Sequence, residues 1–260
     1  IINSLKIPIP SLKEQNKIVA ILSSVDKVIE KAESLINKLK DLKNATMQEL
    51  LTKGIGHTKF KDSPLGKIPE EWEILKMEDI THFMRNGFVG TASPYYTNNY
   101  GIPYLMSNNI RENEFDFTKL VFISKEFHIK QSNSILKTGD LLTVQSGHIG
   151  TSCVVTKDLE GSNCHALIIS RLKTKKVNPY FLAFLINSHN TNGMISKIYV
   201  GSTIQHINVK HFIKYTIALP SIREQDKITN ILTSIKYKIN YQKKHLSKII
   251  NLKTALMQDL

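Results

Sequence analysis

The stretch Ile9-Pro-Ser-Leu-Lys-Glu-Gln-Asn-Lys-Ile18 returns near the end of the chain as Leu219-Pro-Ser-Ile-Arg-Glu-Gln-Asp-Lys-Ile228. A second pair of segments, Leu42-Lys-Asn-Ala-Thr-Met-Gln-Glu-Leu50 and Leu252-Lys-Thr-Ala-Leu-Met-Gln-Asp-Leu260, repeats at the same offset, and no gap is needed between the two matches. An internal repeat of this kind indicates one structural element that is used twice. Residues 11–50 and 221–260 are therefore expected to share one structure.

Each copy opens with a pattern typical of a helix N-terminus. Ser11 with Glu14, and Ser221 with Glu224, have the spacing of a capping box. In that motif the serine hydroxyl accepts a hydrogen bond from a first-turn N–H, and the glutamate accepts one from the serine N–H. Both copies are therefore expected to begin as capped helices.

Apolar residues recur every seven positions after the first cap, which is the heptad pattern of a coiled coil. Its rows are Ile18, Val25, Ala32 and Leu39; Ile21, Val28, Leu35 and Leu42; and Leu22, Ile29 and Ile36. The second copy is less regular, since Lys238, Gln242 and His245 lie on or beside its apolar rows. Neither copy contains an interior Gly or Pro, so each can form one helix of about 38 residues.

A long helix with one apolar stripe needs a partner, and the nearest candidate is its own repeat. The sequence thus predicts an antiparallel coiled-coil pair. Two unrelated surface helices packed on a globular core are the alternative, but they would not explain the matching caps and the matching Met-Gln endings. The predicted fold class is α+β, with one mixed α/β domain flanked by the two repeated helices.

The predicted domains follow from these boundaries. The first long helix is expected over 11–53, a Gly-, Pro- and Ser-rich linker over 54–69, the mixed domain over 70–220 and the second helix over 221–260. Within the mixed domain we expect strands at 72–76, 121–124, 140–145, 153–156, 166–172 and 213–219, and a short helix at 179–187. Residues 1–10 match 211–220, so they are expected to be the tail strand of a missing preceding domain, which would make this sequence a fragment or a processed half.

Charge and hydropathy narrow the class of partner. The formal net charge of +13 favours an anionic partner, and nucleic acid is the first candidate, although the excess of basic residues is spread along the chain. The sequence has no apolar run of the roughly 20 residues that a membrane-spanning helix needs. A cytoplasmic protein with no membrane partner is therefore expected.

Several motifs stand in a recognisable order. The helix motifs are Glu14-Gln-Asn-Lys-Ile18 and Met47-Gln-Glu-Leu-Leu-Thr-Lys-Gly54, and Ser63-Pro-Leu-Gly-Lys-Ile-Pro-Glu-Glu-Trp-Glu73 follows them. Further along come Gly101-Ile-Pro-Tyr-Leu105, Lys137-Thr-Gly-Asp-Leu-Leu142, Asn178-Pro-Tyr-Phe-Leu182 and Gly201-Ser-Thr-Ile-Gln205. This order resembles the specificity (S) subunit of type I restriction-modification systems over the whole chain, and the helix motifs are more specific than those of the target-recognition domain.

The resemblance implies a DNA sequence-specific binding subunit with no catalytic site of its own. In that family two recognition domains each bind half of a bipartite DNA site, and the paired helices hold them apart. Methyltransferase (M) subunits dock on the helices and recognition domains, and a restriction/motor (R) subunit joins for cleavage. S-adenosylmethionine, ATP and Mg are expected on those partners, and no cofactor on this chain. Because the sequence holds one complete recognition domain, it is expected to read one half-site, unless two half-subunits self-associate.

Polar loops on a rigid scaffold are the candidate DNA contacts, because Asn and Gln can pair with adenine and Arg with guanine. The candidates are Arg85, Asn86, Ser107, Asn108, Asn109, Arg111, Ser146, His148, Ser202, Thr203, Gln205 and His206. Ordinary turn or capping chemistry explains any single member equally well. The prediction therefore concerns the set.

Two other functions stay open at this point. Asn178-Pro-Tyr-Phe181 is similar to the motif with which amino-methyltransferases hold a flipped base, which would suit an autonomous adenine DNA methyltransferase. It lacks a second proline, and an asparagine N-cap followed by proline in the first helical turn explains it too. A coiled-coil scaffold without a DNA role is the other alternative. The spacing of His148, Cys153, Cys164 and His165 matches no familiar zinc pattern, so no metal site is expected.

Overall fold

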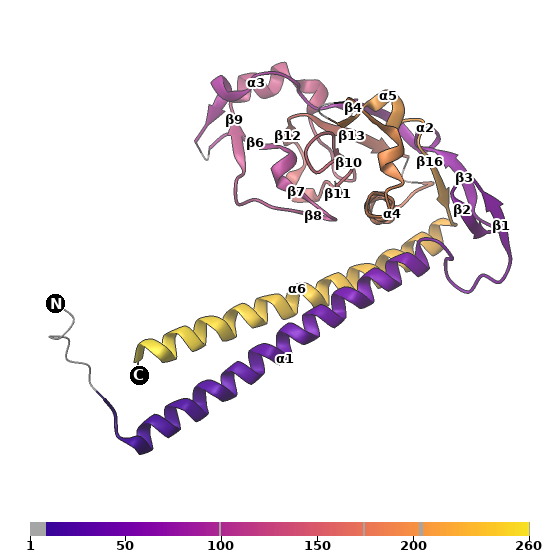
Figure 1. The fold of residues 1–260 in the computed structure, drawn as a ribbon. Helices are drawn as coiled ribbons and strands as arrows, with labels where there is room; N and C mark the ends of the chain where they lie inside the picture. The colour runs from indigo at the N-terminus through magenta and orange to yellow at the C-terminus, as the bar shows by residue number, and fades with distance from the viewer. Residues whose placement is uncertain (1–8, 99, 174, 203–204, 260) are drawn as a thin grey trace. The chain divides into compact units, whose positions relative to one another are not determined.

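The two repeated segments fold as two long helices, α1 (Leu12–Leu50) and α6 (Ile222–Asp259) (Figure 1). This computed structural model describes residues 9–98, 100–173, 175–202 and 205–259. The chain divides into two compact units, one made of Ile1–Thr46 with Leu232–Leu260 and the other of Met47–Ile231. The expected tail strand at 1–10 falls mostly outside the described residues, and Ile9 and Pro10 belong to no strand.

The helices pair in antiparallel fashion, as the repeat predicts. Asp26, in the first half of α1, forms an ion pair with Lys253, near the end of α6; the Nζ–Oδ1 distance is 2.5 Å. At the other end, the backbone N–H of Ile55, just after α1, donates to Glu224 in the first turn of α6. These two contacts place opposite ends of the helices together, and Figure 1 shows the two helices side by side.

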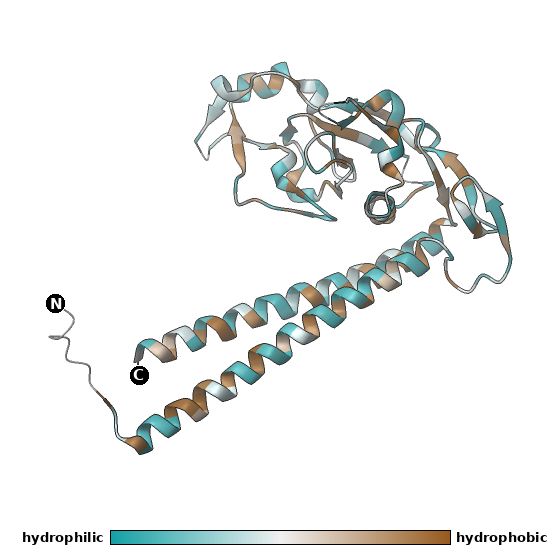
Figure 2. Cartoon of the chain, in the orientation of Figure 1, coloured by the Kyte–Doolittle hydropathy of each residue, from teal (hydrophilic) through white to brown (hydrophobic). Residues whose placement is uncertain are grey.

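Burial identifies which apolar rows form the seam between the helices. Ile36 and Leu39 of α1 and Ile228, Leu232 and Ile239 of α6 are buried. Of the polar residues expected on or beside the second seam, Gln242 is half-buried, whereas Lys238 and His245 are exposed. The row Ile21, Val28, Leu35 and Leu42 stays exposed, so two of the three predicted α1 rows form the seam and the third does not. Figure 2 shows apolar and hydrophilic residues alternating along both helices, as a one-sided seam requires.

The two helix N-termini are capped differently. At the first, Ser11 N–H donates to Glu14 Oε2 at 2.8 Å, which completes the predicted capping box, and the hydrogen bonds from Ser11 lower the pKa of Glu14. At the second, Glu224 N–H still donates to Ser221 Oγ. The Glu224 carboxylate instead binds the linker, where it meets His57 Nε2 at 3.0 Å. The second capping box is therefore only half formed, because a closer partner from the linker takes the carboxylate.

The linker itself contains a hairpin, which the sequence did not indicate. Strands β1 (Phe60–Ser63) and β2 (Gly66–Pro69) pair in antiparallel register around the turn that contains Gly66. Gly66 has a φ of 96°, a conformation that glycine adopts without strain, and Ser63 Oγ donates to the Gly66 carbonyl at 2.6 Å. Ile68 then packs with the fully buried Trp72 and with Ala218. The segment expected as a plain linker is thus partly ordered by its own turn chemistry.

The second unit is built around two four-stranded sheets. The first has the order β11-β10-β13-β4 and is antiparallel throughout; its strands are β4 (Thr81–Asn86), β10 (Leu141–Val144), β11 (Ser152–Val154) and β13 (Leu167–Leu172). The second has the order β12-β6-β9-β5, with strands β5 (Tyr96–Thr97), β6 (Ile102–Leu105), β9 (Val121–Ile123) and β12 (Asn163–Cys164). Its β12–β6 pair is parallel, so the predicted mixed domain is confirmed.

Shorter pairs and helices complete this unit. The pairs are β3 (Glu73–Lys76) with β16 (Thr216–Leu219), β7 (Ile110–Arg111) with β8 (Glu114–Phe115), and β14 (Tyr199–Val200) with β15 (His206–Ile207). The helices are α2 (Met77–Ile80), α3 (Lys125–Lys130), α4 (Pro179–Thr191) and α5 (Val209–Phe212). A hydrophobic core packs on the sheet that contains β10, β11 and β13, with Leu142, Val144, Cys153 and Leu167 among its members.

The N-terminus of α4 is held by Asn178. Its side-chain oxygen accepts from the backbone N–H groups of Tyr180 and Phe181, at 2.9 and 3.2 Å, so the predicted N-cap is confirmed. Its own backbone N–H donates to Gln225, and its side-chain N–H donates to Asp226. The asparagine therefore ties α4 to the first turns of α6.

A buried histidine gives this unit a pH-dependent stability. His189, near the end of α4, lies 3.0 Å through Nδ1 from the hydroxyl of Tyr215, and burial lowers its pKa to about 4. Between its unfolded pKa, roughly 6.5, and pH 4, the unfolded chain takes up a proton that the folded chain does not. The contribution of His189 to stability is therefore fully present above about pH 6.5. It is lost as the pH falls toward 4, which lowers the free energy of unfolding by up to about 3 kcal/mol.

Urea unfolding of the chain at a series of pH values between neutrality and pH 4 measures this loss. The variant His189→Gln keeps a polar group beside Tyr215 and removes the titration, so its stability is expected to change less over this range. A variant that loses stability with the parent's slope would show that another group is responsible. His128 and His165, whose pKa values burial also lowers, are the other contributors to compare.

Candidate nucleic-acid interface

Two of the predicted polar segments meet at one end of the first sheet. Asn86, the last residue of β4, pairs with Ile168 near the start of β13, and Leu167 pairs with Val144 at the end of β10. The end of β4, the start of β13 and the end of β10 therefore lie together. The chain leaves β10 at this end into the loop that carries Ser146 and His148, both exposed.

Two more segments join the same end. Ser146 forms an antiparallel bridge with His206 of β15, and Ile207 N–H donates to the Gln145 carbonyl at 3.0 Å. His148 Nε2 lies 3.1 Å from the carbonyl oxygen of Ile110, which precedes Arg111 in β7. Residues near 86, 146 and 206, distant in sequence, are thus linked by strand pairing, and the His148 side chain links residue 110 to them. We call this group of segments the polar sheet end.

The candidate DNA contacts predicted from the sequence differ in how exposed they are to solvent. Ser146, His148, Ser202 and Gln205 are exposed, and His206 is half-buried. Ser107 and Asn108 are half-buried in the 3-10 helix η3 (Ser107–Asn109). Thr203 lies outside the described residues.

Arg85 and Asn86 are not in a loop, as the sequence suggested, but at the end of strand β4. The guanidinium of Arg85 lies 3.9 Å above the ring of Phe83 and donates to Asn133 at 3.1 Å. Asn86 is exposed at the strand end. Arg85 is therefore held in one orientation, whereas Asn86 faces solvent.

Asn109 is a structural residue, which corrects its expected place among surface contacts. It is fully buried; its amide oxygen accepts from Met106 N–H, and its amide N–H donates to the Asp116 carbonyl, both at 2.9 Å. These bonds occupy the groups that a base contact would need. Arg111 stays about half exposed while it pairs with Asp116 at 2.9 Å.

The polar sheet end also holds a residue that sequence reasoning considered only as a metal ligand. His165 forms a parallel bridge with Phe88, two residues after Asn86, and its Nδ1 lies 3.2 Å from the Tyr104 hydroxyl. Burial lowers the pKa of His165, which favours the neutral ring. Its position immediately before the strand predicted at 166–172 is the signal that could have found it.

The chemistry available at this end is hydrogen bonding. It presents amides, hydroxyls and imidazoles, which are the groups that read base edges. Among the residues that the structure describes, no three His, Cys, Asp or Glu side chains gather where they could hold a metal ion. Cys153 and Cys164 are buried and are not joined in a disulfide, and burial raises the pKa of Cys164. None of the helices in the described ranges is long and apolar enough to cross a membrane.

The chain matches the family model described as "Type I restriction modification DNA specificity domain" over residues 1–41 and 69–251. It is 27% identical to the type I restriction enzyme MjaVIII specificity subunit of Methanocaldococcus jannaschii, over 99% of this chain and 61% of that protein. It is also 27% identical to the EcoKI specificity subunit of Escherichia coli K12, over 71% of this chain and 40% of that protein. The chain thus spans about three fifths or less of the length of these relatives.

Solved structures have the same fold. The HsdS subunit from Thermoanaerobacter tengcongensis superposes with a TM-score of 0.62 at 18% identity, covering 97% of this chain and 59% of that one. A chain from a study of complex assembly and conformational transition in the type I restriction-modification system gives a TM-score of 0.64 at 19% identity, covering 97% and 60%.

Proposed function

Because this chain belongs to the family of type I restriction modification DNA specificity domains, we propose that it reads one half of a bipartite DNA site and has no catalytic site of its own. The observation that carries the proposal is the convergence of four polar segments at the polar sheet end. The domain formed by residues 70–220 is the reader, and the paired helices are the spacer between half-sites.

Base-edge contacts supply sequence specificity, while phosphate contacts supply register and most of the affinity. The exposed amides and hydroxyls at the polar sheet end suit the first task. The net charge of +13 suits the second. We propose that the exposed and half-buried candidate DNA contacts touch base edges or phosphates. Asn109, which is buried, is not among them. Thr203 stays a proposal from sequence alone.

The remaining parts of the function belong to partners. We propose that methyltransferase subunits dock on the helices and bring S-adenosylmethionine, and that a restriction subunit brings ATP and Mg. Two copies of the chain could associate to restore a pair of readers. The cytoplasm, where bacterial and archaeal DNA lies, is the proposed location.

The replacement Gln205→Ala is expected to lower affinity for the target site by about 5- to 150-fold, because one good base-edge pair contributes ~1–3 kcal/mol of discrimination. Affinity for unrelated duplexes should change little. Fluorescence anisotropy measures the affinity for the target duplex and for an unrelated duplex. The target sequence is read from the sites that are methylated in cells carrying the system. Thr58→Ala is the control, since Thr58 is exposed and lies in the linker.

Further outcomes separate the alternatives. Binding of S-adenosylmethionine by the purified chain, seen by calorimetry, would favour an autonomous methyltransferase. If Asn86→Ala, Gln205→Ala and His206→Ala all leave target-site methylation by the assembled complex unchanged, the scaffold interpretation replaces ours. A target affinity that does not fall steeply with salt would also contradict DNA reading.

A further inference from the structure

A pocket of about 360 Å³ lies in the second unit. Val154, the last residue of β11, lines it and pairs with Leu141 at the start of β10. The polar sheet end begins at Val144, the last residue of β10. The pocket therefore lies at the other end of β10 from Ser146 and His206. It meets the candidate DNA contacts at β7, where Arg111 pairs with Glu114 of the pocket.

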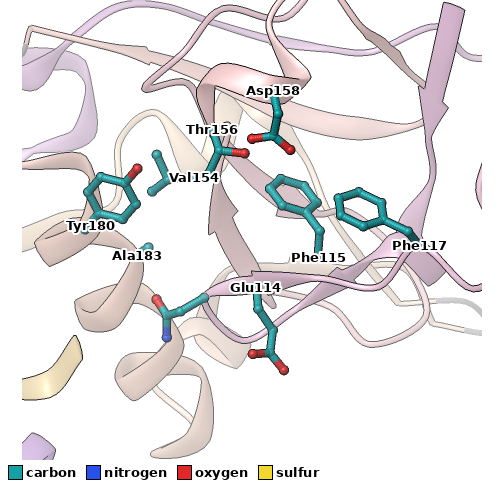
Figure 3. A pocket seen from close by; sticks show the side chains of 9 residues that line it. Glu114, Phe115, Phe117, Val154, Thr156, Asp158, Tyr180 and Ala183 are labelled. Atoms are coloured by element: carbon teal, nitrogen blue, oxygen red, sulfur yellow. The ribbon is translucent and has the colours of Figure 1, made fainter. Parts of the chain in front are cut away.

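Aromatic rings form two sides of the pocket. Figure 3 shows Tyr180 of α4 on one side and Phe115 and Phe117 on the other, with Val154 and Ala183 between them. Phe115 and Phe117 have nearly parallel rings, with centroids 5.9 Å apart. Phe117 and Tyr180 are each 46% exposed. Large rings left this open at a concave site are a common mark of a binding surface.

The pocket also carries negative charge. Asp158, in the 3-10 helix η5 (Lys157–Leu159), stands beside Phe115 (Figure 3), and Glu114 lines the pocket as well. Within the described parts of the chain, the Asp158 carboxylate makes no hydrogen bond or ion pair. An exposed carboxylate next to open aromatic faces is a favourable site for a cation, because the ring faces and the carboxylate both attract positive charge.

We propose that this pocket receives an arginine or lysine side chain of a protein partner. Carboxylates repel phosphates, so a nucleic-acid strand fits the charge of the pocket poorly, in contrast with the basic chain as a whole. The aromatic rings and the apolar floor take the methylene stem of the cationic side chain and an apolar neighbour. The pocket is therefore a protein-docking site in the DNA-reading domain, and its test needs no DNA.

The probe is the peptide acetyl-Leu-Arg-Leu-amide, titrated into the full ¹⁵N-labelled chain by NMR. Its neutral counterpart, with citrulline in place of arginine, has nearly the same shape without the charge. We expect the arginine peptide to shift the amide signals of residues 114–117 and 154–158, and the citrulline peptide to bind about tenfold or more weakly. Asp158→Asn and Phe117→Ala should each weaken binding of the arginine peptide by a similar factor.

Asp62→Asn, in β1, is the matched control and should leave the titration unchanged. Thermal unfolding of each variant checks that the fold is intact, which the exposure of Asp158 and Phe117 favours. Equal binding of the two peptides, or no shift of the pocket signals, overturns the proposal. Shifts of the same signals by adenosine or by a short DNA duplex, with none from the arginine peptide, would assign the pocket to nucleic acid and overturn it too.

Discussion

Arg171→Gln is expected to lower the free energy of unfolding by about 3–5 kcal/mol, because it strands a buried carboxylate. In β13, Arg171 donates through Nε and Nη2 to the two carboxylate oxygens of Asp140, at 2.8 and 2.7 Å. The Asp140 side chain is only 2% exposed and also accepts from Lys137 N–H. The hydrogen bonds that Arg171 donates to Asp140 raise the pKa of Arg171, so the guanidinium stays charged. Urea unfolding at neutral pH measures the loss.

Arg111→Gln is the matched control for that experiment. It removes an arginine–carboxylate contact of similar length, 2.9 Å to Asp116, but its side chains are 46% and 27% exposed. Exposed pairs contribute at most about 1 kcal/mol, because water and salt screen them. Losses of equal size in the two variants would contradict the view that burial of Asp140 decides the effect.

Leu39→Ala is the second variant with a large expected effect, a loss of about 2–5 kcal/mol. Leu39 is 7% exposed on the seam between α1 and α6, where truncation leaves a cavity. The loss should appear in the unfolding transition that removes the helical signal, since α1 and α6 are the longest helices described. Circular dichroism during urea unfolding follows that transition.

Leu42→Ala removes the same atoms three residues further along the same helix. Leu42 is 52% exposed, so its truncation should change stability by a few tenths of a kcal/mol at most. Similar losses at both positions would mean that the seam does not separate the two rows. This comparison also tests which of the predicted heptad rows is internal.

The sequence was most informative where one signal dominated. The repeat and its heptads predicted both helices, their pairing and the Ser11 cap, because apolar spacing and capping chemistry are local. The strands at 140–145 and 166–172 were found because they are short apolar runs between turns. The N-cap at Asn178 was found for the same local reason.

The misses have a common physical cause, which is dependence on distant partners. Strand β4 reads Thr81-His-Phe-Met-Arg-Asn86 and lacks simple alternation, since it is ordered by pairing with β13. Asn109 looked like a surface amide, and only its bonds to Met106 and Asp116 show that it is internal. For the candidate site, the set of polar segments could be predicted, but their meeting at one sheet end required the strand registers.

The divided role of Glu224 bears on how such modules can be exchanged between chains. Gly54, with a φ of 68°, lies so close to Glu224, His57 and Trp72 that no larger residue fits without displacing them. His57 follows α1, Glu224 lies in the first turn of α6, and Trp72 belongs to the recognition domain itself. A chimera joined within 58–71 would keep the His57–Glu224 contact but could change the Trp72 ring that packs edge-on against His57. A graft should therefore transfer residues 54–72 as one segment, together with the end of α1 and the first turn of α6 that contact it.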